Sequence, residues 1–373
     1  MSKSVKYLSS QQLQQHVQDL IERRTAPSLA VTAVQGNETI LTYGNGLADL
    51  EQGTRATPQT IYLYCSMTKL FTATALMQLC ERGLVDLDQT VRDYVPNFQV
   101  CHASGREITL RHLLSHSSGL ANPIPVNWVH LADEPAVPLN ALTQRLLAKH
   151  RQLVFEPGSR YAYSNLGYLV LGQVIEHVSG ENYPAYIQKY ILDVLDMRRT
   201  GFSYQYIPDQ DIATGYVRSF SPMGILRRFL IDRRIFAASR AGYTAFHRFL
   251  IDGSAYGGLL GPVADLGNFM KAYLNGGTFK GRRLLEQSSI VEMQTAQRDL
   301  HGKELVTGRQ MSQRVGLGWH LNGDGETRHC YHFGGGGGFW CELRVYPKLN
   351  YGITVLGNDT SYDTEAITTN VVA

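Results

Sequence analysis

The sequence has few cysteines, little net charge and no long apolar run, and each shortage excludes a class of protein. Five cysteines without C-x-x-C spacing argue against a disulfide framework and against a zinc site. A net charge of +3 over 373 residues is too small for a nucleic-acid-binding surface. No apolar run approaches the roughly 18 to 20 residues of a membrane-spanning helix.

Residues 1–10 also lack the apolar segment of a secretory signal. Together with the unpaired thiols, this absence predicts a reducing, cytoplasmic location. The apolar content is ample for the core of one large domain or of two interlocked domains. We therefore expect a globular protein with no cofactor, metal, nucleic-acid partner or membrane contact. Its oligomeric state stays open, a homo-oligomer included.

The stretch from Tyr64 to Lys69 opens a long apolar helix that we expect to end at Gly83. Ser66 and Lys69 lie one turn apart and therefore share a face. A serine hydroxyl becomes a strong nucleophile when a base takes its proton, and a lysine whose pKa is lowered by burial can do this. The helix N-terminus would favour the negative oxygen that forms when Ser66 attacks an acyl carbon.

Two other interpretations of this stretch are weaker. Ser66 could be a capping serine and Lys69 a surface lysine, but a helix that is apolar nearly all round disfavours a solvated lysine. Lys69 is also the only one of the nine lysines with a serine three residues before it. Cys65 is a more reactive neighbour, yet its position one residue earlier turns its side chain about 100° away from Lys69. We expect Cys65 to pack against a sheet.

Periodic apolar patterns predict the remaining elements. An amphipathic helix at residues 11–24 is followed by a hairpin of strands 28–34 and 39–43. From residue 315 onward the pattern has the two-residue period of strands, which predicts an antiparallel meander. The further helices expected are 108–114, 140–151, 166–179, 263–275 and 288–294, and the meander strands are 316–321, 328–333, 339–346 and 351–356.

Tyr163 and Asn165 immediately precede the helix predicted at 166–179. The structural explanation is that Asn165 is its N-cap and Tyr163 a packed aromatic. The pattern Y-x-N also occurs at two other places in the chain. Only this copy follows the Ser66 helix and directly precedes a new helix, where its side chains can point across a cleft.

His112 and His116 lie one turn apart, which invites a metal interpretation. The motif H-E-x-x-H needs a glutamate after the first histidine, and Leu113 stands there instead. We therefore expect hydrogen-bonded structural histidines.

The second meander strand ends in His332-Phe333-Gly334, and Gly334 begins a run of five glycines. Such a run could be only a flexible turn. It could also let a substrate acyl group approach the strand edge and use a backbone N–H, which a Cβ would hinder.

Residues 218–250 form a basic segment with seven arginines and a single acidic residue, Asp232. Its apolar residues recur at helical spacing. We expect first a docked pair of helices, second a lid over a cleft and third a membrane-surface element.

Three motifs stand in the order that is found in serine β-lactamases and penicillin-binding proteins. They are S-x-x-K at Ser66–Lys69, Y-x-N at Tyr163–Asn165, and H-x-G at His332–Gly334. Residues 108–120, 156–172 and 191–202 resemble segments of the class C β-lactamase-like branch, which includes family VIII carboxylesterases. The resemblance covers nearly the whole chain, and residues 218–250 match least.

The resemblance implies that Ser66 is the acylated nucleophile and Lys69 its proton partner. Tyr163 would be a general base or acid that relays a proton to the leaving group, and Asn165 a donor to the substrate. The oxyanion hole would consist of the backbone N–H groups of Ser66 and Gly335.

His332 departs from the K-T-G motif of most β-lactamases, although Gly334 matches it. The lysine of K-T-G gives a fixed charge beside a substrate carboxylate, whereas a histidine is largely neutral near pH 7. The resemblance therefore leads toward the esterase and D-aminopeptidase-like branches.

The implied fold class is α/β (α+β), an antiparallel sheet flanked by helices with a second, mostly helical domain, as in β-lactamases and transpeptidases. We expect residues 1–82 and 255–373 to form the α/β domain, residues 83–254 the mostly helical domain, and the site to lie in the cleft between them. The implied function is a serine hydrolase that forms an acyl-enzyme, a carboxylesterase on small or medium acyl esters. A D-stereospecific peptidase or amidase and a weak β-lactamase are alternatives. The alternative of another class is a non-catalytic protein that binds acyl ligands or a partner.

Overall fold

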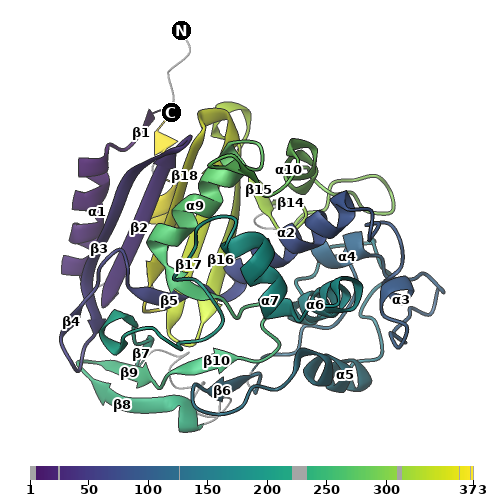
Figure 1. Ribbon diagram of the computed structural model, residues 1–373, viewed down its shortest axis with the longest axis horizontal. Helices are drawn as coiled ribbons and strands as arrows, with labels where there is room; N and C mark the ends of the chain where they lie inside the picture. The colour runs from purple at the N-terminus through teal and green to yellow at the C-terminus, as the bar shows by residue number, and fades with distance from the viewer. Residues whose placement is uncertain are drawn as a thin grey trace.

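The computed structural model describes residues 6–23, 26–125, 127–220, 233–308, 313–360, 362–369 and 371–372. Its centre is an eight-stranded antiparallel sheet in the order β14-β15-β16-β17-β18-β2-β3-β4 (Figure 1). These strands are β2 (Ser28–Gln35), β3 (Glu38–Asp49), β4 (Thr54–Arg55), β14 (Arg314–Val315), β15 (His320–Asn322), β16 (His329–Gly336), β17 (Phe339–Tyr346) and β18 (Tyr351–Gly357). The predicted hairpin and C-terminal meander thus belong to one sheet.

The alternation of side chains along β2 buries both faces of the sheet. Leu29 and Val31 share one core with α1 (Ser10–Glu22) and α11 (Glu365–Thr368). Ala30 and Val34 point the other way, into a larger core that includes α9 (Val263–Leu274). Figure 1 shows α1 and α9 on opposite faces. Because both faces are covered, β2 is apolar along most of its length.

The long apolar helix predicted after Ser66 is α2 (Thr68–Glu81), and every residue from Thr68 to Met77 is buried. Gly83 follows its end at φ +67°, a left-handed conformation that suits glycine at a helix C-terminus. Helices packed beside α2 occupy the right of Figure 1. These and the remaining helices are α3 (Val91–Tyr94), α4 (Leu110–Leu114), α5 (Leu139–Lys149), α6 (Asn165–Ser179), α7 (Tyr183–Ile187) and α10 (Gln287–Met293).

The described part of the basic segment differs from the predicted helix pair. It forms β8 (Phe236–Arg240) and β9 (Tyr243–Phe246), which pair with β7 (Tyr216–Arg218) in a three-stranded sheet, and β10 (Phe249–Ile251), which pairs with β6 (Val129–Leu131). The helix prediction is therefore wrong for 236–251. Residues 221–232 lie outside the described residues. The division of the chain into two domains stays a prediction.

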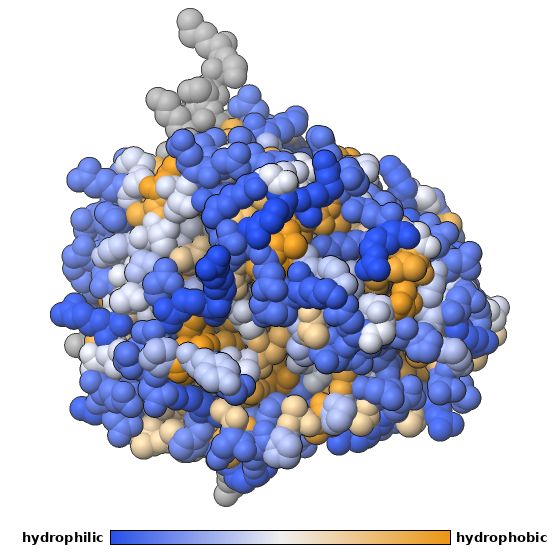
Figure 2. Space-filling model, in the orientation of Figure 1, coloured by the Kyte–Doolittle hydropathy of each residue, from blue (hydrophilic) through white to orange (hydrophobic). Residues whose placement is uncertain are grey.

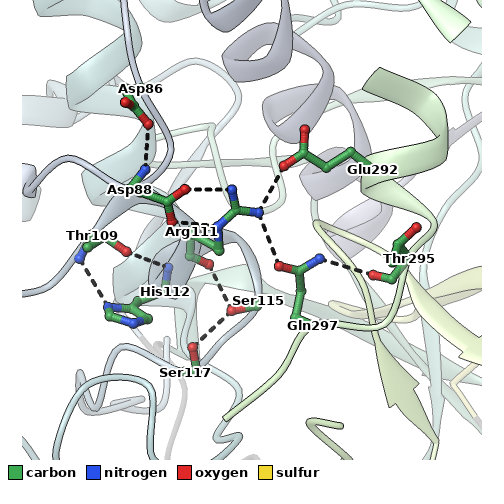
Figure 3. A network of polar contacts seen from close by, with 10 residues as sticks. All are labelled: Asp86, Asp88, Thr109, Arg111, His112, Ser115, Ser117, Glu292, Thr295 and Gln297. Carbon is green, nitrogen blue, oxygen red and sulfur yellow. Dashed lines mark hydrogen bonds and ion pairs between the residues drawn. The ribbon is translucent and has the colours of Figure 1, made fainter. Parts of the chain in front are cut away.

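Arg111 on α4 joins three segments through a polar network (Figure 3). Its guanidinium donates to both carboxylate oxygens of Asp88 (2.7 and 2.8 Å) and to Glu292 on α10 (2.9 Å). It also donates to the Gln297 side chain (3.3 Å). These bonds hold the segment that carries His112 and His116 against the rest of the protein.

The face of the molecule that Figure 2 shows is mostly hydrophilic, with apolar residues in small separate patches. Within the part of the chain that the structure describes, no helix combines the length and apolarity needed to cross a membrane.

Candidate active site

Ser66 lies at the turn between a strand and the buried helix α2. β5 (Ile61–Leu63) leads into a 3-10 turn at Cys65–Met67, directly before α2. Cys65 has φ +49°, which non-glycine residues rarely adopt. Both neighbours of Ser66 are buried, whereas Ser66 is only half-buried. The turn thus leaves Ser66 as the accessible residue of the three.

Lys69 is fully buried beneath Ser66. Its ammonium donates to Ser66 Oγ (3.2 Å), to Asn165 Oδ1 (2.8 Å) and to the carbonyl oxygen of Tyr256 (2.7 Å). All three acceptors are neutral, and no carboxylate among the described residues forms an ion pair with Lys69. Burial therefore holds the pKa of Lys69 well below its usual value. A neutral amine at this place can accept the Ser66 proton.

Tyr163 lies on the other side of Ser66. Its hydroxyl is hydrogen-bonded to Ser66, and Lys69 Nζ lies 4.9 Å from the centre of its ring. Burial raises the pKa of Tyr163 above its usual value, so the phenol stays protonated at neutral pH. Ser66 therefore contacts both an amine that ionises weakly and a phenol that keeps its proton.

Asn165 does not cap α6, so that prediction is wrong. The N-cap is Ser164, whose hydroxyl accepts a hydrogen bond from the Gly167 N–H (3.1 Å). Asn165 is the first residue of the helix, and its side-chain oxygen points to Lys69. Its own N–H donates to Asn122 Oδ1 (3.0 Å). Because Ser164 serves as the cap, the Asn165 side chain is available to the site.

His332 lies on β16 and is buried. Its Nδ1 lies 2.6 Å from the carbonyl oxygen of Phe333, and because a carbonyl only accepts, Nδ1 carries the proton. Burial, reinforced by the charges of His320 and Lys69, holds the pKa of His332 well below its usual value. His332 is therefore neutral at pH 7, as its residue type suggested.

Gly334 and Gly335 lie where β16 passes the 3-10 turn at Cys65–Met67. A Cβ at Gly334 would lie 2.2 Å from the carbonyl oxygen of Tyr64 and 3.2 Å from Cys65 Cβ. A Cβ at Gly335 would lie 2.3 Å from the Trp340 ring. Both positions therefore require glycine for close packing, in addition to any use of their N–H groups. The oxyanion hole formed by Ser66 and Gly335 stays a prediction.

Cys65 packs against the sheet, as expected. Its Sγ lies 3.7 Å from the carbonyl oxygen of Gly336 on β16. It also interacts with the thiol of Cys341 on β17. These contacts direct the thiol toward the strands, while Ser66 carries the contacts to Lys69 and Tyr163.

Sequence reasoning missed two residues at this site. Tyr256 contributes only a backbone carbonyl, which leaves no signal in a sequence. His116 was interpreted as a structural histidine, but its ring lies 4.3 Å from the ring of Tyr163. His112 instead caps its own helix, because its Nδ1 accepts the Thr109 N–H (3.2 Å). In the described ranges, no group of three or more histidine, cysteine and acidic side chains is placed to hold a metal ion.

A family model described as Beta-lactamase matches residues 13–372. The chain belongs to the beta-lactamase family. This is the serine hydrolase superfamily that the three motifs predicted, and the antiparallel sheet with its helices confirms the predicted fold class.

Two curated relatives and one solved structure place the chain within this family. Protein flp of Staphylococcus aureus (strain MW2) is 26% identical over 357 residues, with 94% of this chain and 63% of flp covered. The chain thus spans less than two thirds of the length of flp. The D-alanyl-D-alanine-carboxypeptidase/endopeptidase AmpH of Escherichia coli (strain K12) is 26% identical over 344 residues, with 89% of this chain and 79% of AmpH covered. The octameric penicillin-binding protein homologue from Pyrococcus abyssi superposes with a TM-score of 0.77 at 26% identity, over 97% of this chain and 76% of that chain.

Proposed function

We propose that the protein is a serine hydrolase that forms an acyl-enzyme at Ser66, and that it acts as a carboxylesterase on small or medium acyl esters. The observation that carries the hydrolase proposal is the pair of contacts that Ser66 makes. Lys69 donates to its Oγ from a buried site, and Tyr163 hydrogen-bonds it from the other side. The first can accept a proton and the second can give one.

The chemistry follows from these two contacts. Neutral Lys69 takes the proton of Ser66 while Oγ attacks the ester carbonyl carbon. The N–H groups of Ser66 and Gly335 stabilise the oxyanion, and Tyr163 gives its proton to the leaving alcohol. In the second half, Tyr163 takes a proton from the attacking water and protonated Lys69 returns its proton to Ser66. The acid and the alcohol are the products, and the enzyme is restored.

The preference for uncharged esters rests on the charges around the site. Among the described residues, Lys69 is the only basic side chain hydrogen-bonded to Ser66, Tyr163 or Asn165. The Lys69 nitrogen is already hydrogen-bonded to Ser66, to Asn165 and to the carbonyl oxygen of Tyr256, and His332 is neutral. A substrate carboxylate would lose water on entry without gaining a counter-charge, which is costly. A neutral ester needs none.

The second candidate is a D-stereospecific peptidase or amidase, and a weak β-lactamase is the third. The similarity to AmpH over 89% of this chain favours the peptidase. In either case the chemistry at Ser66 is the same, and only the substrate differs.

A substrate panel separates these activities on one preparation. We expect kcat/KM for p-nitrophenyl butyrate at pH 8 to exceed that for nitrocefin and for D-alanine p-nitroanilide by a wide margin. His332→Lys should narrow the gap for nitrocefin, because it adds the charge of the K-T-G motif. Equal turnover of nitrocefin and the ester would contradict the ester proposal. No fluorophosphonate labelling of Ser66 would contradict the hydrolase proposal itself.

We also propose a cytoplasmic homo-oligomer. The Pyrococcus abyssi homologue is octameric, and the unpaired thiols fit a reducing compartment. Light scattering on the purified protein measures the oligomeric state, and a monomer at micromolar concentration would contradict this proposal.

A further inference from the structure

His116 follows α4 and is 3% exposed. It has φ +54°, a left-handed conformation that histidine and asparagine tolerate better than most residues. It was singled out in the sequence only as a partner for His112, and the reaction proposed above does not use it.

His116 accepts two hydrogen bonds, one from each neighbour of Tyr163 in the chain. Its carbonyl oxygen accepts the N–H of Ala162 (2.8 Å), and its ring Nδ1 accepts the N–H of Ser164 (3.1 Å). The residues on either side of Tyr163 are thus tied to one residue. Because Nδ1 accepts, the proton is on Nε2, and burial together with the Lys69 charge holds the pKa of His116 well below its usual value. Nδ1 can accept the Ser164 N–H only while the His116 ring is neutral.

The ring of His116 also packs on the side chain it brackets. Its centre lies 4.3 Å from that of Tyr163, with 33° between the planes, and 5.0 Å from that of Tyr168. Tyr161 meets the same ring edge-on at 5.8 Å. Aromatic contacts on several sides fix the orientation of a ring as well as its position. They keep the Tyr163 hydroxyl directed at Ser66.

The contacts of His116 are also linked to Lys69 through α6. Ser164, held by His116, is the N-cap of α6, and the next residue, Asn165, accepts a hydrogen bond from Lys69. One histidine thereby fixes the start of α6 and both functional side chains of the Y-x-N motif.

We propose that His116 is a positioning residue for the reaction, which holds the Tyr163 hydroxyl where it can protonate the leaving group. This inference rests on the proposed role of Tyr163 as the proton donor. It predicts that loss of His116 slows the reaction most for substrates whose leaving group must be protonated by Tyr163.

Two substitutions separate the ring of His116 from its acceptor atom. His116→Phe keeps the aromatic contacts and leaves the Ser164 N–H without its acceptor. His116→Asn keeps an acceptor near the position of Nδ1 and tolerates the left-handed backbone. His112→Phe is the matched control, because it makes the same change at a half-buried histidine on α4 whose ring nitrogen Nδ1 accepts the N–H of its own N-cap residue, Thr109.

Each variant is assayed on an alkyl butyrate, whose alkoxide must be protonated, and on p-nitrophenyl butyrate, whose phenolate leaves without a proton. We expect His116→Phe to lower kcat/KM, which reports acylation and not the deacylation that both esters share, about 100-fold for the alkyl ester, the scale of a 1 Å misplacement. The loss for the p-nitrophenyl ester should be less than about tenfold. His116→Asn should lose less than about tenfold on either ester, and His112→Phe should not change their ratio.

A folded His116→Phe variant with wild-type kcat/KM on the alkyl ester would overturn the proposal, as would equal losses in kcat/KM on both esters. If His116→Phe does not fold, His116→Ala takes its place with the same expected difference between the esters. Tyr163→Phe distinguishes the two levels of inference. If it keeps full turnover of the alkyl ester, the proposed role of Tyr163 fails; if it is impaired while His116→Phe is not, only the role of His116 fails.

Discussion

The surroundings of two basic side chains, Lys69 and Arg111, shift their pKa values in opposite directions. Arg111 donates to the carboxylates of Asp88 and Glu292 (Figure 3), and these contacts raise its pKa. Lys69 is more deeply buried and has only neutral oxygen atoms as acceptors, so its pKa is lowered. A nearby carboxylate stabilises the protonated form of a base and raises its pKa, whereas burial without a carboxylate favours the neutral form and lowers the pKa.

The difference separates a structural role from a chemical one. The Arg111 network ties together segments that are distant in the sequence and that carry no reacting group. Lys69 forms no such tie between charges, and an amine that is desolvated and unpaired is unfavourable for stability. This arrangement fits the proposed reaction, in which the neutral amine of Lys69 accepts the Ser66 proton.

The largest expected effect is at the nucleophile itself. Ser66→Ala should lower kcat by about a million-fold, as loss of the nucleophile does in other serine enzymes. Cys65→Ala is the matched control and should keep most of the activity, because its thiol packs against the strands. Intact mass after fluorophosphonate treatment identifies the labelled residue. A label that disappears with Cys65 instead of Ser66 would show that the nucleophile is misassigned.

Lys69→Arg gives position 69 a side chain that, like Arg111, cannot lose its proton. A guanidinium stays protonated at any accessible pH, so the variant keeps the charge but cannot act as a base. We expect kcat to fall by about 100- to 10,000-fold, the range of a lost general base. Arg111→Lys should change kcat less than tenfold. Comparable losses in the two variants would mean that charge alone matters at position 69.

Asn165→Asp gives Lys69 the counter-charge that Arg111 has. A carboxylate 2.8 Å from Nζ should raise the pKa of Lys69, so that activity at pH 7 falls and is recovered at higher pH. Asn165→Ala is the control, because it removes the amide without adding charge. Rate profiles from pH 6 to 10 check this. The idea is wrong if both variants lose activity without a shift of the rising limb.

Arg111→Met should act on stability and hardly on activity. The Arg111 side chain is 29% exposed, and one of its partners, Asp88, is 67% exposed, so solvent screens the pairs. We expect the free energy of unfolding to fall by about 1 to 2 kcal/mol, and kcat by less than threefold. Urea denaturation measures the first quantity. Arg92→Met, at an ion pair with Glu107 whose arginine side chain is 49% exposed, should cost less than about 0.5 kcal/mol.

Much of the site could be predicted from the sequence because its motifs are local. Ser66 and Lys69 share a helical face by spacing alone, and Gly83 and the β2–β3 hairpin follow from turn chemistry. The choice between Ser164 and Asn165 as the cap could not be predicted. Both residue types are good caps, and the outcome depends on Lys69, which comes from a distant part of the chain.

The strands at 236–251 escaped prediction for a related reason. Their turn has positive φ at Ala241 and Gly242, the pattern of a type I′ hairpin, but it lacks the usual Asn-Gly or Asp-Gly signal. The pairing of β9 with β7 is a long-range contact. The helical spacing of apolar residues in the same basic segment favours a helix instead.

The most direct test of the central claim is the pH dependence of fluorophosphonate labelling at Ser66, because labelling needs the nucleophile and its base but no substrate pocket. The fraction of neutral Lys69 increases as pH rises through its lowered pKa, while Tyr163 keeps its proton because its pKa is raised. We therefore predict a labelling rate that rises with pH and levels off well below 10.5, the usual lysine value. A rate that still rises steeply through 10.5 would show that Lys69 is an ordinary cation and would contradict the account.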